Sequence, residues 1–163
     1  MATVYLGLGS NLGERRQNLE RALTMLSGKL KITTRSSIYE TTSLYDAAQP
    51  GFLNMVFRAE TELTPFELLD LARDTELRQG RTSGHNRPRP VDIDLLFYDD
   101  IVIDTEQLSL PHPRLAERAF VLVPLAEIAP SLVHPVSGKT ISQMLADLPA
   151  GQVIKKYEEE TCV

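Results

Sequence analysis

Cysteine, tryptophan and long hydrophobic runs are scarce or missing in this sequence. Its 163 residues include one cysteine, Cys162, and no tryptophan. A single thiol cannot form an internal disulfide, which favours a reducing cytoplasm and a fold held together by its hydrophobic core. No apolar run reaches the roughly 18 residues of a membrane-spanning helix, and residues 1–4 do not resemble the start of a signal peptide. We therefore expect neither membrane insertion nor export.

Excess positive charge is also missing, because the net charge is −5 at pH 7. This argues against a general nucleic-acid-binding protein. An RNA-binding module would also need several aromatic side chains on one face of a sheet, and the third predicted strand offers only Phe52 there. One segment, 78–89, nevertheless carries four arginines and no acid, which indicates local affinity for phosphate: Arg78, Arg81, Arg87 and Arg89.

Hydrophobic periodicity predicts one domain over residues 1–163 with the core order β-α-β-β-α-β. The expected core elements are strand 3–9, a helix that Asn11 and Glu14 cap, strands 32–41 and 52–62, helix 64–79, and a strand containing Asp92 and Asp94. This order predicts a ferredoxin-like α+β fold, with a mainly antiparallel sheet, helices on one face and the other face available for ligands. Beyond the core we expect a brief strand at 101–103, as part of a C-terminal hairpin, and helices from Leu115 to Ile128 and from Thr140.

Asp92 and Asp94 are the most informative residues, because they lie two apart in a predicted strand that follows the arginine-rich segment. Side chains alternate between the faces of a strand, so both carboxylates point the same way, with Cα atoms roughly 6.5 Å apart. Oxygen ligands of this kind suit hard cations, and two carboxylates can converge on two Mg²⁺ ions about 4 Å apart. The pattern indicates phosphate chemistry, although an exposed Asp-x-Asp on a half-buried strand is the simpler interpretation.

Other motifs have weaker interpretations. The glycines at 7, 9 and 13 suggest a dinucleotide-binding loop, but their spacing is one residue too long and the element order is wrong for a Rossmann half. A first strand whose second face lacks side chains, so that a flat ligand can approach, explains them better. The three histidines lack zinc-site spacing. Phe52 and Asn54 share a strand face that suits a flat heterocycle, although Phe52 and Phe120 are also plausible core residues.

Six blocks of the sequence, taken in order, resemble the 6-hydroxymethyl-7,8-dihydropterin pyrophosphokinase family of folate biosynthesis. They span most of the chain and comprise residues 7–13, 39–41, 49–54, Glu76 with 80–81, 87–96, and 111–114 with 118–120. The resemblance implies transfer of pyrophosphate from MgATP to the hydroxymethyl group of the pterin, with release of AMP. We also expect a cytoplasmic enzyme that is a monomer or weak homodimer.

The same resemblance assigns roles to individual residues. Asp92 and Asp94 bind two Mg²⁺ ions and are catalytic together with Arg81 and Arg89. Contacts with ATP are implied for Glu76, Arg81, Arg89, Leu95, His112 and Arg118. Contacts with the pterin are implied for Thr41, Thr42, Leu44, Phe52, Asn54, Asp92 and Phe120.

Three positions depart from the family pattern. No tryptophan precedes Pro88-Arg89, Arg73 replaces a glutamine-like residue, and Thr42-Ser43 replaces a pair of prolines. Two alternatives therefore stay open. One is a pterin- or nucleotide-binding homologue that has lost turnover, and the other is an Asp-x-Asp nucleotidyl or glycosyl transferase.

Overall fold

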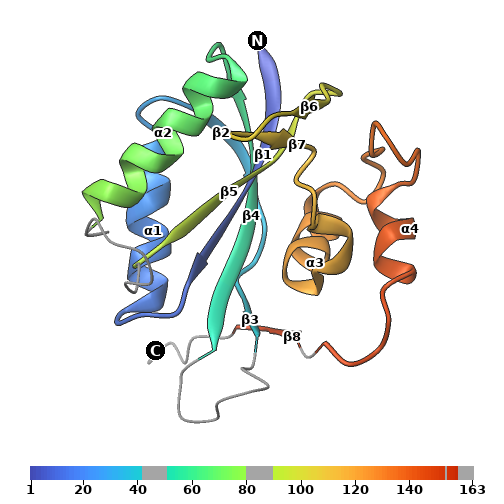
Figure 1. Ribbon diagram of the computed structural model, residues 1–163. Coiled ribbons are helices and arrows are strands. Elements are labelled where there is room, and N and C mark those ends of the chain that lie inside the picture. The colour runs from blue at the N-terminus through green and yellow to red at the C-terminus, as the bar shows by residue number, and fades with distance from the viewer. Residues whose placement is uncertain (42–50, 80–89, 153, 158–163) are drawn as a thin grey trace.

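A central antiparallel sheet organises the molecule. The computed structural model describes residues 1–41, 51–79, 90–152 and 154–157. The strands of the main sheet are β1 (Ala2–Ser10), β2 (Lys31–Arg35), β3 (Tyr39–Thr41), β4 (Phe52–Thr61), β5 (Asp92–Tyr98) and β8 (Ile154–Lys156). Their order is β5-β1-β4-β3-β8, and β2 also pairs with β4 (Figure 1). The strand order and the antiparallel pairing are those of the predicted ferredoxin-like core.

The predicted second strand is divided into β2 and β3. Both pair with β4, but residues 36–38 leave the ladder between them. Ser36 carries the chain across this break, since its backbone N–H donates to the Val56 carbonyl at 2.8 Å and its hydroxyl accepts from the Val56 N–H at 2.9 Å. The division lets β3 turn towards the end of the sheet, where β8 joins it.

The two core helices, α1 (Arg15–Leu26) and α2 (Pro65–Arg78), begin differently. At α2 the predicted capping box is confirmed, because the Thr64 hydroxyl accepts from the Glu67 N–H while the Glu67 carboxylate accepts from the Thr64 N–H. At α1 the predicted Asn11 cap is wrong. Gly13 adopts a left-handed φ of 63° and turns the chain, so the helix starts four residues after Asn11 with Glu14 at its N-cap.

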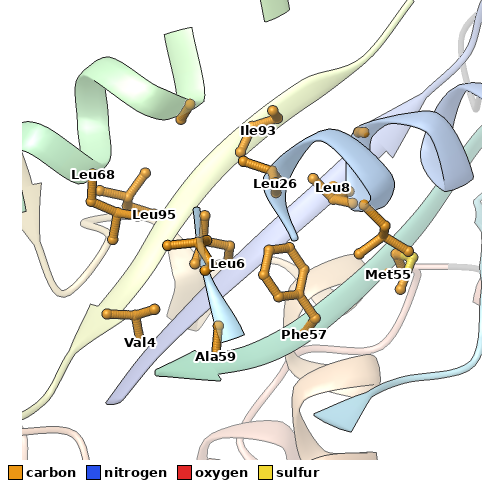
Figure 2. Close-up of a cluster of buried hydrophobic side chains, with 14 of the residues drawn as sticks. Val4, Leu6, Leu8, Leu26, Met55, Phe57, Ala59, Leu68, Ile93 and Leu95 are labelled. Atoms are coloured by element: carbon orange, nitrogen blue, oxygen red, sulfur yellow. The ribbon is translucent and has the colours of Figure 1, made fainter. Parts of the chain in front are cut away.

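The face of the sheet under α1 and α2 forms a buried apolar layer. Odd-numbered residues of β4 and even-numbered residues of β1 meet the two helices there, as Figure 2 shows for Leu6, Leu26, Phe57 and Leu68. Burial of each such side chain stabilises the fold by about 1.5–3 kcal/mol before entropy is subtracted. This layer holds the sheet rigid from one side.

The opposite face is covered at one end by α3 (Ala119–Ile128), and α4 (Ile141–Ala146) packs on the outer side of α3 (Figure 1). Helix α3 and the sheet enclose a second hydrophobic cluster, the α3 cluster. A β-bulge, where the β1–β5 register shifts between Tyr5 and Leu6, allows the consecutive residues Leu96 and Phe97 both to join it. The prediction that this face is available for ligands therefore holds for only part of it, because α3 buries its apolar side against one end. The end with Gly7 and Gly9 stays open, and a cavity lies there.

The C-terminal third differs from its prediction in detail. The brief strand is β6 (Ile103–Asp104), which pairs with β7 (Ser109–Leu110). The predicted helix 115–128 is interrupted into a 3-10 turn η1 (Leu115–Glu117) and α3. Arg118, in extended conformation with φ −117° and ψ 106°, occupies the break. In the part of the chain that the structure describes, no helix has both the length and the apolar character needed to cross a bilayer.

Candidate functional site

A cavity of about 280 Å³ opens over the sheet face that α3 leaves uncovered. Strands β1, β3, β4 and β5 and the start of α3 all contribute to its lining: Gly7, Leu8, Gly9, Thr41, Phe52, Asn54, Met55, Val56, Asp92, Asp94, Arg118, Phe120 and Val121. Seven of the residues that the sequence assigned to a site meet here, namely Thr41, Phe52, Asn54, Asp92, Asp94, Arg118 and Phe120. The sheet order brings them together, because β1 lies between β4 and β5.

Glycines form the floor of the cavity. Gly9 pairs with Asn54 on one side and Asp92 on the other, while Gly7 pairs with Val56 and Asp94. A Cβ atom at Gly9 would lie 3.0 Å from the Asn54 side-chain oxygen. The missing side chains therefore let a flat group lie against the backbone between the amide and the carboxylates.

One end of the cavity is charged. Asp92 and Asp94 are half-buried on the same face of β5, as their alternation predicts. The guanidinium of Arg118 lies 3.9 Å from the Asp94 carboxylate and 5.3 Å from the centre of the Phe120 ring. Arg118 is thus held between an acid and an aromatic face, with its charge directed at the carboxylate end.

His112 lies beside this charged end. Its backbone N–H donates to the Leu96 carbonyl at 3.0 Å, and its Nδ1 accepts from the Arg114 N–H at 3.2 Å. Burial lowers the pKa of His112 below its usual value, Asp94 opposes this shift, and Arg118 and Arg114 reinforce it. The ring is therefore neutral at pH 7, with Nε2–H as its donor.

The other end of the cavity is aromatic and amide-lined. Phe52 is 37% exposed, so its interpretation as a core residue is wrong: it is the first residue of β4, and its face of the sheet is uncovered there. Phe120 is partly buried against the α3 cluster and lines the cavity from the other wall. Asn54 is buried, and its amide nitrogen donates to the Thr41 hydroxyl at 3.4 Å. Two rings and an oriented amide suit a flat, polar-edged ligand.

The carboxylate pair fits magnesium. Mg²⁺ is commonly held by one or two carboxylates, with substrate phosphates and water completing its octahedron. Among the described residues, no three His, Cys, Asp or Glu side chains gather as a metal site, so the chain supplies few ligands of its own there. Asp92 and Asp94 beside an open cavity leave room for such external oxygens.

Three residues that the sequence assigned to ATP lie outside the cavity lining. His112 is near it, as described above. Leu95 is buried in the α1/α2 core, so its side chain does not line the cavity. Glu76 is 5% exposed, and its carboxylate accepts from the Ile93 N–H at 2.9 Å. Glu76 thereby supports β5 between the two aspartates. Thr42, Leu44, Arg81 and Arg89, together with the tryptophan-free stretch before Pro88-Arg89, lie outside the described residues.

Sequence reasoning missed several lining residues. Val56 shares the parity of Phe52 and Asn54, so strand alternation could have found it. Val121 could not be found this way, because the break at Arg118 sets the start of α3. Arg15 does not line the cavity, and no local pattern indicated its contacts because its partners lie 25 and 36 residues away.

Comparison with known proteins agrees with this geometry. The family model described as 7,8-dihydro-6-hydroxymethylpterin-pyrophosphokinase (HPPK) matches residues 5–130. A relative named 2-amino-4-hydroxy-6-hydroxymethyldihydropteridine pyrophosphokinase, from Methylorubrum extorquens, is 43% identical over 155 residues, which are 93% of this chain and 97% of the relative.

Longer relatives also contain this unit. The chain is 38% identical over 149 residues to the folic acid synthesis protein FOL1 of Dictyostelium discoideum, and the match covers 91% of this chain but 23% of that protein. A crystal structure of wild-type HPPK-DHPS from Plasmodium falciparum aligns with a TM-score of 0.73 over 89% of this chain and 44% of its own, at 16% identity, which shows a shared fold. From the family match and the full-length relative, the chain belongs to the 7,8-dihydro-6-hydroxymethylpterin-pyrophosphokinase family.

Proposed function

We propose that this chain transfers the terminal pyrophosphoryl group of ATP to the hydroxymethyl oxygen of 6-hydroxymethyl-7,8-dihydropterin, releasing AMP, as a step of folate biosynthesis. Family membership supports the reaction. The observation that carries the proposal is the two-ended cavity, in which Gly9 separates an amide and an aromatic ring from a carboxylate pair. Such a site can hold a flat heterocycle and a phosphate chain side by side.

The aromatic end binds the pterin in this proposal. Phe52 and Phe120 stack on the two faces of the ring, and each such contact contributes about 0.5–1.5 kcal/mol beyond area burial. Asn54, held by its bond to Thr41, reads the polar edge of the ring. A buried amide discriminates strongly, since a ligand without the matching donor and acceptor leaves it unpaired. Thr42 and Leu44 are proposed to complete this end, with Asp92 near the hydroxymethyl group.

The charged end binds the phosphates. We assign two Mg²⁺ ions to Asp92 and Asp94, and when bound they would offset the charge of the phosphate oxygens. Arg118 and the neutral His112 supply further donors, and Arg81 and Arg89 are proposed to do the same. Glu76 is also proposed to contact the nucleotide, in addition to accepting its hydrogen bond from Ile93.

Catalysis on this arrangement is mainly positioning. The pterin oxygen forms a bond to the β-phosphorus while the bond to the α-phosphate oxygen breaks, and AMP leaves. Transfers of this type need aligned reactants and compensated charge more than covalent help from the protein. In this proposal both reacting groups lie against one sheet. Asp92 or Asp94 is the nearest acceptor for the hydroxyl proton.

One assay tests the proposal. The purified chain is incubated with ATP, Mg²⁺ and the hydroxymethyl pterin, and AMP and the pterin diphosphate are quantified by chromatography. Formation of both in equal amounts supports the proposal. Pterin binding without AMP would point to a homologue that has lost turnover, and release of pyrophosphate would point to nucleotidyl transfer.

Location and assembly belong to the same proposal. A single cysteine is compatible with a cytoplasmic enzyme, and we propose a single domain that acts as a monomer or weak homodimer. Sedimentation velocity at micromolar concentration tests the assembly.

A further inference from the structure

Arg15 makes contacts from outside the cavity that converge on its pterin end. The Nη1 atom donates to the Glu40 carboxylate at 2.7 Å and to the Gly51 carbonyl at 2.6 Å. Only 19% of the Arg15 side chain is exposed. Glu40 directly precedes Thr41, and Gly51 directly precedes Phe52. One guanidinium group thus holds the residue next to each of two cavity-lining residues.

Strand alternation explains how Arg15 can act from the face of the sheet opposite the cavity. Thr41 pairs with Phe52, and Glu40 with Leu53, in the β3–β4 ladder. Thr41 and Phe52 line the cavity, so Glu40 and Leu53 face the opposite side, where α1 lies. Arg15 begins that helix. Its bonds therefore join α1 to the backs of the two strand ends that carry the pterin contacts.

These strand ends need an anchor. β3 has three residues, Thr41 is its last and Phe52 is the first of β4, so the ladder stops at this pair. Backbone at the end of a ladder opens more readily than backbone in its middle. A ring that is 37% exposed has little packing of its own to fix it. Unless the strand ends are held, pterin binding must bear the cost of ordering them.

The location of Arg15 is otherwise unfavourable. It is the first residue of α1, where the helix dipole favours acids, and the first turn of α1 contains no acid. The charge-assisted bond to Glu40 offsets this cost. A second support comes from Tyr157, whose ring centre lies 6.0 Å from the guanidinium carbon and whose N–H donates to the Ile38 carbonyl just before β3.

We propose that Arg15 is a positioning residue for pterin binding, which fixes Thr41 and Phe52 through Glu40 and Gly51 without touching the substrate. The inference rests on the proposed function for the identity of its ligand. It predicts a selective effect, because the carboxylate end of the cavity lies on β5, on the far side of β1 from these contacts.

The test compares Arg15→Met, which keeps the apolar stem and removes the donors, with Arg21→Met, an exposed arginine of the same helix. Pterin affinity is measured by calorimetry in the presence of a non-hydrolysable ATP analogue and Mg²⁺, so the reading does not need turnover. We expect pterin affinity to fall about 10-fold in Arg15→Met, as loss of a charged hydrogen bond allows, and by less than about 2-fold in Arg21→Met. ATP-analogue affinity stays within about 2-fold in both.

Steady-state kinetics distinguish a positioning role from a general loss of structure, because only the first changes KM for the pterin while kcat is kept. In Arg15→Met the KM for the pterin rises while kcat stays within about 2-fold, since Arg15 does not act on the phosphates. Glu40→Ala should weaken pterin affinity similarly, and the double variant should be no weaker than either single one. If Arg15→Met does not fold, Glu40→Ala against Arg21→Met decides in its place.

Several results would overturn the inference: unchanged pterin affinity in Arg15→Met, equal losses for pterin and nucleotide, or additive losses in the double variant. Failure of the proposed function is separate. A wild-type chain that binds the pterin without forming AMP refutes the reaction, while the affinity comparison still decides the role of Arg15. A wild-type chain that does not bind the pterin refutes both.

Discussion

The two faces of the sheet use the same strands for opposite purposes. On the α1/α2 face, β1 and β4 present Leu6 and Phe57 to a buried apolar layer. On the other face the same strands present Gly7, Gly9, Phe52 and Asn54 to a cavity. The first face is buried against helices, whereas the second combines a buried cluster under α3 with a cavity in which side chains stay exposed. The period of two along a strand makes this division possible, because neighbouring residues serve different faces.

The largest effect is expected when an aromatic ring is removed from the buried α1/α2 face. Phe57 is fully buried, so Phe57→Ala should lower the free energy of unfolding by about 3–5 kcal/mol through lost burial and a cavity. Phe52→Ala, on the same strand, should lower it by less than about 1 kcal/mol but weaken pterin binding several-fold. Denaturant unfolding and pterin calorimetry on both variants measure this contrast. Equal destabilisation would contradict the division between the faces.

Removal of a carboxylate from the open face should affect turnover and leave the fold intact. In Asp92→Ala and Asp94→Ala we expect kcat to fall at least about 10²–10³-fold, because charge stabilisation at the phosphates is lost. Pterin affinity should change much less, since Phe52, Asn54 and Phe120 remain. AMP formation and pterin calorimetry check this, with Asp100→Ala, an exposed aspartate beyond β5, as the control. Matching losses of turnover and pterin affinity would refute the two-ended site.

Alanine substitutions at Gly7 and Gly9, which form the floor of the cavity, should differ in their effect on pterin binding. A Cβ at Gly9 would press on the Asn54 oxygen at 3.0 Å, whereas one at Gly7 would meet Leu96 at an ordinary 3.6 Å. We therefore expect Gly9→Ala to weaken pterin binding about 10-fold, through displacement of an amide that is paired with its ligand. Gly7→Ala should weaken it less. Calorimetry on the pair is the measurement, and a larger loss in Gly7→Ala would show that Asn54 is not the sensitive group.

The smallest effect concerns pH at the edge of the α3 cluster. His134 packs edge-on against Phe97, with ring centres 5.9 Å apart, and its Nδ1 accepts from the Val136 and Ser137 N–H groups. Burial lowers its pKa below the usual 6.5. The folded state therefore holds the neutral ring, and the stability that this contributes is complete above pH 6.5 and is lost as pH falls through the lowered value.

Two measurements check this expectation. NMR titration of the histidine ring protons should give His134 a pKa below that of an unfolded-chain histidine. Denaturant unfolding at pH 7 and pH 5 should show a smaller loss of stability at pH 5 in His134→Gln than in the parent chain. A loss of the same size in both would assign the pH dependence to other groups.

Local patterns in the sequence were enough to predict the core fold and which of the described site residues share a strand face. Strand alternation placed Asp92 with Asp94 and Phe52 with Asn54 on shared faces, and the Thr64 capping box fixed the start of α2. The family resemblance is confirmed by the match over residues 5–130. These features depend on neighbours within a few residues, which the sequence displays directly.

Other features depended on contacts between distant segments. The break that leaves Arg118 in extended conformation and the bulge at Leu96 arise where α3 packs on the sheet. No periodic pattern in the nearby sequence predicts the break at Arg118 or the bulge at Leu96.

The sequence by itself determined the strand faces, the core order of elements and the carboxylate pair, because each follows from the geometry of a single strand or helix. The predicted fold already placed β1 between β4 and β5, and only the tertiary structure decided the register that brings Asn54 and Asp92 to either side of Gly9. The tertiary structure also decided that Arg15 reaches Glu40 and Gly51. The physical reason is that these neighbours are created by sheet pairing and helix packing, which join residues that no local pattern links.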